Sequence, residues 1–181
     1  PVAAVPAEQT GLITFGSFNN PAKVNEKVID LWAEVLKAVP GSRLLLKYRN
    51  WYDQASLRDS VVKKFSSCGI GQDRIMFSVQ PDTFTEHLVR YCEVDIALDP
   101  FPFNGATTTF QALWMGVPVV SLAGERFTTR IAGSILHHMG LGELVVDTPE
   151  AYVACARDLA GDVARLKTFR KTLRERMANS P

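Results

Sequence analysis

Residues Val94 to Val120 read Val-Asp-Ile-Ala-Leu-Asp-Pro-Phe-Pro-Phe-Asn-Gly-Ala-Thr-Thr-Thr-Phe-Gln-Ala-Leu-Trp-Met-Gly-Val-Pro-Val-Val. The apolar run at the start predicts a buried strand over 94–98, and the run at the end predicts a second strand that begins at Pro118. Between them the pattern predicts a loop, a polar turn and a short helix over about 108–115. The polar turn thus follows the carboxyl end of a buried strand, where ligands bind in open α/β sheets.

The polar turn is suited to binding an anion. Asn104-Gly105-Ala106 can turn tightly, because Gly105 can adopt a positive φ and has no side chain that would obstruct a ligand. Thr107, Thr108 and Thr109 follow at the helix start, where the first amides lack partners within the helix and the helix dipole is partly positive. Phosphate is the anion that such a terminus usually binds.

A helix cap is the alternative interpretation of the same threonines. Thr is a good N-cap residue, and that role alone would explain Thr107. Threonine-rich turns without a ligand are common, so the residues by themselves leave both interpretations open.

The composition is that of a globular protein and excludes several classes of function. The chain has 181 residues, of which 46% are hydrophobic and 22% charged, enough for one domain with a sizeable core. A net charge of +1 disfavours nucleic acid as a partner, and no apolar run approaches membrane-spanning length. Cys68, Cys92 and Cys155 are scattered, which indicates buried thiols in a reducing compartment. We therefore expect a cytoplasmic protein that binds neither nucleic acid nor membranes.

Apolar periodicity predicts that strands and helices alternate along the rest of the chain. Residues 1–10 are expected to be a linker, and residues 11–181 one domain, cut from a longer protein because Pro1 is not preceded by Met. The expected strands cover 12–18, 43–48, 74–79, 94–98, 119–122 and about 144–145. The expected helices cover 25–39, 54–67, 83–92, 108–115, 128–139, 149–160 and 162–178. This order predicts an α/β fold, a Rossmann-like, doubly wound and mostly parallel sheet.

The usual cofactor signatures of such a sheet are missing. Gly-Ser-Phe-Asn-Asn-Pro follows the first strand in place of Gly-x-Gly-x-x-Gly, which disfavours NAD and FAD, and there is no Walker A sequence. Asp95 and Asp99 are four residues apart and do not form the Asp-x-Asp with which metal-dependent sugar transferases hold a cation. His137 and His138 are adjacent in a helix and cannot share a face. We expect neither a metal site nor a cofactor.

Further polar side chains are expected beside the threonine turn. Lys23 follows the first strand, which commonly neighbours the fourth in a doubly wound sheet, so its ammonium could stabilise charge on a bound diphosphate. His87 lies early in the helix after the third strand, and Gln111 lies one turn into the central helix, where each could contact a ligand. The alternatives stay open that Lys23 is an ordinary solvated lysine and that His87 is a half-buried residue without a ligand.

Three blocks in the same order resemble glycosyltransferase family 41, the family of O-linked N-acetylglucosamine transferase and SPINDLY. The blocks are Thr14 to Lys23, Val94 to Thr109 and Ala112 to Arg126, and the likeness extends from Leu12 to about Met177. The resemblance implies the GT-B architecture, in which two Rossmann-like domains face each other across a cleft, and this chain is similar to the C-terminal domain. It further implies a partner N-terminal half and, as is usual in bacterial members, tetratricopeptide repeats upstream.

The resemblance also implies the roles of individual residues. Lys23 matches the lysine that binds the donor diphosphate and is needed for transfer, and Thr107 and Thr108 match the threonine pair that binds the same phosphates. Gln111 falls where relatives place an acid that bonds the ribose hydroxyls. The nucleobase is expected to bond to the backbone around 79–82. The full set of residues expected to bind the donor, besides the catalytic Lys23, is Asn20, His87, Asn104, Gly105, Thr107, Thr108, Thr109 and Gln111.

The implied reaction moves a sugar from a UDP- or GDP-sugar to a protein Ser or Thr without a metal. The acceptor hydroxyl attacks the anomeric carbon while Lys23 and the helix terminus neutralise the departing diphosphate. N-acetylglucosamine, fucose and glucose are the sugars that the family implies. We expect little or no activity from this chain alone, because the acceptor face would lie on the N-terminal half.

Two positions depart from the family pattern. Ala106 stands where relatives have His or Thr, and Gln111 is a neutral amide in place of a carboxylate. Both changes concern contacts to the donor, and they are the basis of an alternative hypothesis, a non-catalytic module that binds nucleotide sugars or acts as a scaffold.

Overall fold

Six parallel strands form the sheet that the sequence predicts. The computed structural model describes residues 2–79 and 83–180, and its strand order is β3-β2-β1-β4-β5-β6. Every pair of neighbouring strands is parallel. The strands are β1 (Thr14–Ser17), β2 (Arg43–Leu46), β3 (Ile75–Phe77), β4 (Ile96–Leu98), β5 (Val119–Leu122) and β6 (Val145–Val146). The order reverses between β1 and β4, and at such a switch point the loops separate and leave room for a ligand.

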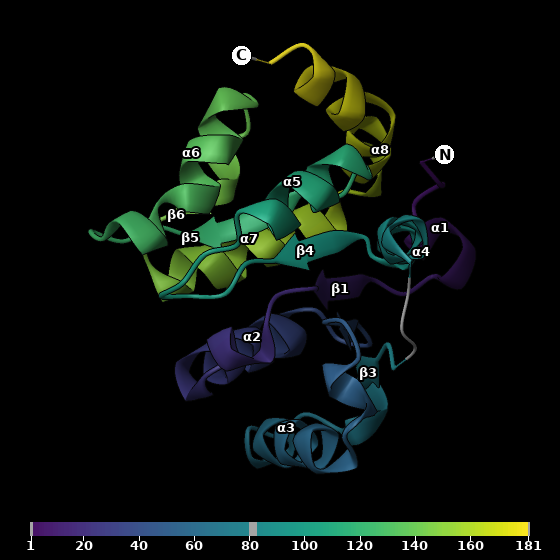
Figure 1. Ribbon diagram of the computed structural model, residues 1–181, viewed down its shortest axis with the longest axis vertical. Coiled ribbons are helices and arrows are strands. Elements are labelled where there is room, and N and C mark those ends of the chain that lie inside the picture. Colours follow the sequence, from purple (N-terminus) through teal and green to yellow (C-terminus); the bar gives the residue numbers. More distant parts are fainter. Residues whose placement is uncertain (1, 80–82, 181) are drawn as a thin grey trace.

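Helices cover both faces of the sheet, as expected for a doubly wound fold. Figure 1 shows α2 and α3 on one side of β1 and β4, with α5 and α6 on the other. Across the molecule, α2 packs against α7, and α5 packs against α6 and α8. The helices are α1 (Ala7–Thr10), α2 (Glu26–Ala38), α3 (Ala55–Ser67), α4 (Phe84–Val89), α5 (Thr107–Trp114), α6 (Ile131–His138), α7 (Pro149–Gly161) and α8 (Val163–Ala178).

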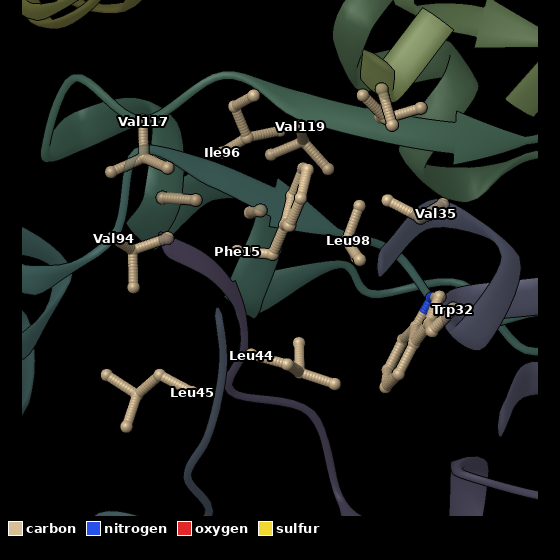
Figure 2. Packing of buried hydrophobic residues seen from close by; sticks show 14 of the residues in the cluster. Phe15, Trp32, Val35, Leu44, Leu45, Val94, Ile96, Leu98, Val117 and Val119 are labelled. Atoms are coloured by element: carbon tan, nitrogen blue, oxygen red, sulfur yellow. The ribbon is translucent and has the colours of Figure 1, made fainter. Parts of the chain in front are cut away.

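The central strands are buried on both faces. Every residue of β1, β4 and β5 is buried, including the polar residues Thr14, Ser17 and Ser121 among their apolar neighbours. Figure 2 shows this packing around Phe15 and Ile96, with Trp32 and Val35 of α2 at one side. The helix α2 starts where the sequence predicts, since the Asn25 side chain accepts a hydrogen bond from the Val28 amide at 3.1 Å.

Residues 2–10, part of the segment whose composition indicates a linker, contact the domain. Val5 is 1% exposed, and the short helix α1 follows it. The Ala7 amide donates to Asp95 Oδ1 at 3.0 Å, and the Thr14 amide donates to Asp95 Oδ2 at 2.8 Å. A buried carboxylate far along the chain therefore holds this segment on the domain, and a local reading of sequence could not identify that partner.

The last helix is fastened by a buried arginine. Arg170 of α8 is 5% exposed and donates to the carbonyl oxygens of Met115 at 2.9 Å and Tyr91 at 3.4 Å, and also to that of Val94. The carbonyl oxygens of Tyr91 and Val94 belong to the segment before β4, and that of Met115 lies at the end of α5. The guanidinium therefore ties α8 to the elements that carry the polar turn.

No helix of residues 2–79 and 83–180 is both long enough and apolar enough to pass through a bilayer.

Candidate functional site

The switch point between β1 and β4 brings Lys23 to the threonine turn. Lys23 ends the 3-10 helix η1 (Pro21–Lys23), which follows β1 after three residues. Its ammonium donates to the Asn104 carbonyl oxygen at 3.0 Å and lies 4.4 Å from the centroid of the Phe103 ring. Because β1 pairs with β4 and their carboxyl ends open on one edge, Lys23 lies beside Asn104 in the loop that leads to α5.

Burial lowers the pKa of Lys23 from its ordinary value of 10.5, and the nearby carboxylate of Asp99 opposes this shift. An ammonium that has lost part of its hydration interacts more strongly with an incoming anion. Lys23 is half-buried and hydrogen-bonded to the Asn104 carbonyl oxygen, which is less than the full solvation of the alternative interpretation.

Asp99 holds the polar turn in place through hydrogen bonds to its buried side chain. Its side chain is buried, with Oδ1 accepting from the Gly105 amide at 2.7 Å and Oδ2 accepting from the Ser121 hydroxyl at 2.7 Å. Burial raises its pKa to about 7, although these two hydrogen bonds and Lys23 act in the opposite direction. Asp99 has the role of an anchor for the loop, which the sequence did not indicate.

Gly105 is required for a different reason from the one expected. It is not among the glycines with positive φ. A Cβ atom there would instead lie 2.3 Å from Thr108 Oγ1 and 3.0 Å from Asn19 Oδ1. Glycine permits the loop to pass close beneath the helix start, and this close packing replaces the predicted left-handed turn.

The start of α5 is uncapped within the described chain. Thr107 is the first helical residue, and Ala106 takes the N-cap position without a side-chain hydrogen bond. The cap interpretation of Thr107 is therefore wrong, because a residue inside the helix cannot serve as its N-cap. The first amides of α5 remain available to an external anion, as the phosphate interpretation requires.

The three threonines do not act alike. Thr107 is exposed, whereas the Thr108 hydroxyl donates to Asn19 Oδ1 at 3.0 Å. Thr109 is 2% exposed, and its hydroxyl donates to the Gly105 carbonyl oxygen at 3.0 Å. The hydroxyl of Thr109 is turned into the domain by this bond one helical turn back, so its expected contact with a donor is not supported.

Asn104 and Asn20, both expected to contact the donor, form hydrogen bonds within the loops. Asn104 is 0% exposed and its amide donates to the Pro100 carbonyl oxygen at 3.2 Å, so that only its backbone reaches Lys23. The Asn20 side chain accepts from the Ala22 amide at 2.9 Å and so caps the short helix that ends at Lys23. Both residues shape the site, and the side chain of Asn104 lies too deep to touch a ligand.

His87 and Gln111, expected as separate ligand contacts, bond to each other. His87 Nε2 lies 3.0 Å from Gln111 Oε1, and His87 Nδ1 lies 3.1 Å from the ammonium of Lys47. Lys47 directly follows β2 and is 2% exposed. Sequence reasoning missed Lys47, although a lysine that ends an apolar strand at the ligand-binding edge is a usable signal.

The described residues hold no cluster of three or more His, Cys, Asp or Glu side chains suited to a metal ion. The segment 80–82, where the nucleobase is expected to bond, lies outside the described residues, so only Val79 of that prediction can be placed.

Sequence comparison finds that this chain is similar to several named transferases. Residues 6–181 match the model of glycosyl transferase family 41. The chain is 42% identical over its whole length to a probable UDP-N-acetylglucosamine–peptide N-acetylglucosaminyltransferase SPINDLY of Hordeum vulgare. Over 87% of its length it is 33% identical to a UDP-N-acetylglucosamine–peptide N-acetylglucosaminyltransferase of Caenorhabditis elegans. The chain spans only 19% of the barley protein and 13% of the nematode one.

Comparison with solved structures agrees with the fold. A mutant of the Thermobaculum terrenum O-GlcNAc transferase superposes with a TM-score of 0.87 at 34% identity, covering 94% of this chain and 33% of that one. The C-terminal domain of a glycosyl transferase group 1 protein from Francisella tularensis shares the fold alone, with a TM-score of 0.51 at 13% identity. The fold is thus that of a GT-B glycosyltransferase domain. Because the family model matches residues 6–181 of this chain, the chain belongs to glycosyl transferase family 41.

Proposed function

We propose that this chain is the donor-binding half of a metal-independent protein O-glycosyltransferase. The observation that carries the proposal is the hydrogen bond of the Lys23 ammonium to the Asn104 carbonyl oxygen, in the loop that leads into the uncapped start of α5. A nucleoside diphosphate carries its charge on phosphate oxygens, which match an ammonium and a set of free amides.

The same arrangement favours the transfer step. When the oxygen of a protein Ser or Thr replaces the diphosphate on the anomeric carbon, negative charge grows on the departing phosphate. A cation and helix amides already in position stabilise that charge without reorganising. Lys23 therefore has the catalytic role in this proposal, and Thr107 and Thr108 hold the phosphates.

The names of the relatives support N-acetylglucosamine, carried by UDP, as the sugar to test first. Fucose and glucose, carried by GDP or UDP, are the other sugars in the proposal. We further infer that the complete protein is cytoplasmic and bacterial, has the N-terminal half of the active site and tetratricopeptide repeats, and acts on a protein acceptor.

Calorimetric titration of this chain with UDP, GDP and their sugars tests the donor site. We expect one nucleotide to bind in the absence of any divalent cation, since no metal is needed to hold the diphosphate. Binding that required added Mg²⁺ or Mn²⁺, or no binding of either nucleotide, would contradict the proposal.

Turnover is tested on the full-length protein with a peptide acceptor and radiolabelled donors. We expect transfer by the full-length protein and little or none by this chain alone, because the acceptor face belongs to the other half. Full-length protein that binds the nucleotide sugar and never transfers it would favour the alternative, a non-catalytic binding module.

A further inference from the structure

A chain of polar side chains connects the sheet to the central helix. It starts at the ammonium of Lys47, passes through both nitrogens of the His87 ring at 3.1 Å and 3.0 Å, and ends at the amide of Gln111. Three separate elements, the end of β2, α4 and α5, supply its members. None of the three positions is close to the others in sequence.

The chemistry of these groups fixes which of them donates and which accepts in each hydrogen bond. An ammonium can only donate hydrogen bonds, so His87 Nδ1 must accept the one from Lys47. A neutral imidazole that accepts at Nδ1 carries its proton on Nε2, and this N–H must donate to an acceptor. The acceptor is Gln111 Oε1, so the amide nitrogen of Gln111 is left on the opposite side, facing away from His87.

Packing holds the His87 ring in the orientation that this direction requires. The ring lies between Phe18, at a centroid distance of 5.8 Å, and Tyr91, which it meets edge-on at 5.8 Å. The Tyr91 hydroxyl in turn donates to the Thr108 carbonyl oxygen at 3.3 Å, which joins the same wall to the start of α5. With Lys47 2% exposed at its other end, the imidazole is confined on three sides.

Gln111 lies one turn behind the helix start. Residues four apart share a helix face, at about 5–6 Å between their Cβ atoms, so Gln111 lies behind Thr107 on one stripe. A ligand with its phosphates on the first amides of α5 would place its neighbouring group beside the Gln111 amide.

We propose that Lys47 is a positioning residue that acts through His87 to hold the Gln111 amide with its N–H groups toward the ligand. The site then recognises an acceptor oxygen of the nucleoside diphosphate, such as a ribose hydroxyl oxygen. A carboxylate at the same position would accept from the ribose hydroxyls instead. The identity of the ligand rests on the proposed function, whereas the direction of the hydrogen bonds belongs to the free protein.

The direction is measured on the ligand-free chain by long-range proton–nitrogen NMR correlation of its histidine rings, with His87 assigned from the signal lost in His87→Gln. We expect the Nε2–H tautomer alone. Lys47→Met should produce a mixture of tautomers, and Lys47→Arg, which still donates, should restore the single form. An Nδ1–H tautomer or an imidazolium in the unmodified chain overturns the proposal, even if Lys47→Met fails to fold.

Gln111→Glu supplies a matched control. A carboxylate can only accept, so His87 should keep its proton on Nε2 in the Gln111→Glu variant whether or not Lys47 is present. Adding Lys47→Met to that variant should therefore leave the tautomer unchanged. A tautomer that changed equally in both backgrounds would mean that Lys47 acts by general packing, which contradicts the proposed role.

Titration with UDP and GDP extends the test to the ligand. We expect Lys47→Met to weaken binding of the preferred nucleotide about fivefold in the Gln111 background and to have no effect in the Gln111→Glu background. Equal losses in both would overturn the proposal. If the tautomer is as expected and neither nucleotide binds, the proposed function fails while the hydrogen-bond direction stands.

Discussion

The ammonium of Lys23 lies 3.0 Å from the backbone carbonyl oxygen of Asn104, across the gap between the loops that follow β1 and β4. A lysine ammonium has three N–H groups, and one hydrogen bond to a carbonyl leaves two of them for other acceptors. Among residues 2–79 and 83–180 no acidic side chain forms an ion pair with Lys23, so a phosphate would not have to displace one.

Replacing Lys23 by alanine should weaken nucleoside diphosphate binding by about tenfold or more, since a charge-assisted hydrogen bond is worth roughly 1.5–3 kcal/mol. Isothermal titration with UDP and GDP measures the loss. Lys63→Ala removes an exposed lysine on α3 and should leave the affinity as it was. Equal affinity of Lys23→Ala and the unmodified chain would contradict the assignment of a phosphate site to this edge of the sheet.

Gly105→Ala should damage the site more than the fold. The added Cβ would lie 2.3 Å from Thr108 Oγ1, so the start of α5 must shift and its amides would leave their positions. We expect about tenfold weaker nucleotide binding and a free energy of unfolding lower by about 1–3 kcal/mol. Titration and urea unfolding measure the two effects, and Gly161→Ala, where nothing lies within 4 Å, is the matched control. Unchanged affinity would show that the close approach of the loop does not matter for binding.

Asp99 should make stability fall as the pH rises toward neutrality. Its folded pKa is raised by burial from 3.8 to about 7, so between these values the folded protein holds a proton that the unfolded chain has lost. The unfolded state is therefore favoured as the pH rises through this window. Asp99→Asn should abolish that component of the slope, measured by urea unfolding from about pH 4.5 to 7.5. The exposed Asp59→Asn should retain it, and parallel curves for Asp99→Asn and the unmodified chain would refute the assignment.

Arg170→Met should lower the free energy of unfolding by about 2–4 kcal/mol, because it removes hydrogen bonds from a buried charge and leaves carbonyl oxygens of Tyr91, Val94 and Met115 without their donor. The exposed Arg176→Met on the same helix should cost far less. Chemical unfolding monitored by circular dichroism measures both variants. A loss no larger for Arg170 than for Arg176 would mean that α8 is held by its apolar residues alone.

Local pattern and topology predicted most of the fold. Segments rich in apolar residues identified the strands, and the usual adjacency of first and fourth strands was enough to bring Lys23 beside Asn104. The Asn25 cap was likewise visible, because a capping residue acts within three positions of its own. Such features depend on short-range rules or on a topology that many sheets share.

The parts that sequence could not supply depend on partners distant in the chain. Asp95 anchors Ala7 over 88 positions, and Lys47 reaches His87 over 40, so no local window contains either pair. Arg170 lies among the buried apolar residues of its helix, and only its hydrogen bonds to carbonyl oxygens of distant residues identify its role. The hydrogen bond of Thr109 to Gly105, in contrast, spans only four residues and is of a type common for threonine in helices, so it could be predicted from sequence.

The guanidinium of α8 also sets an order of events during synthesis. Residue 170 follows every strand of the sheet in the sequence, so the carbonyl oxygens of Val94 and Met115 lack their guanidinium partner until α8 has been synthesised. The nascent domain must therefore wait in an incomplete state with the underside of α5 uncovered. The packing around α5 is therefore complete only after α8 has been synthesised and has docked against it.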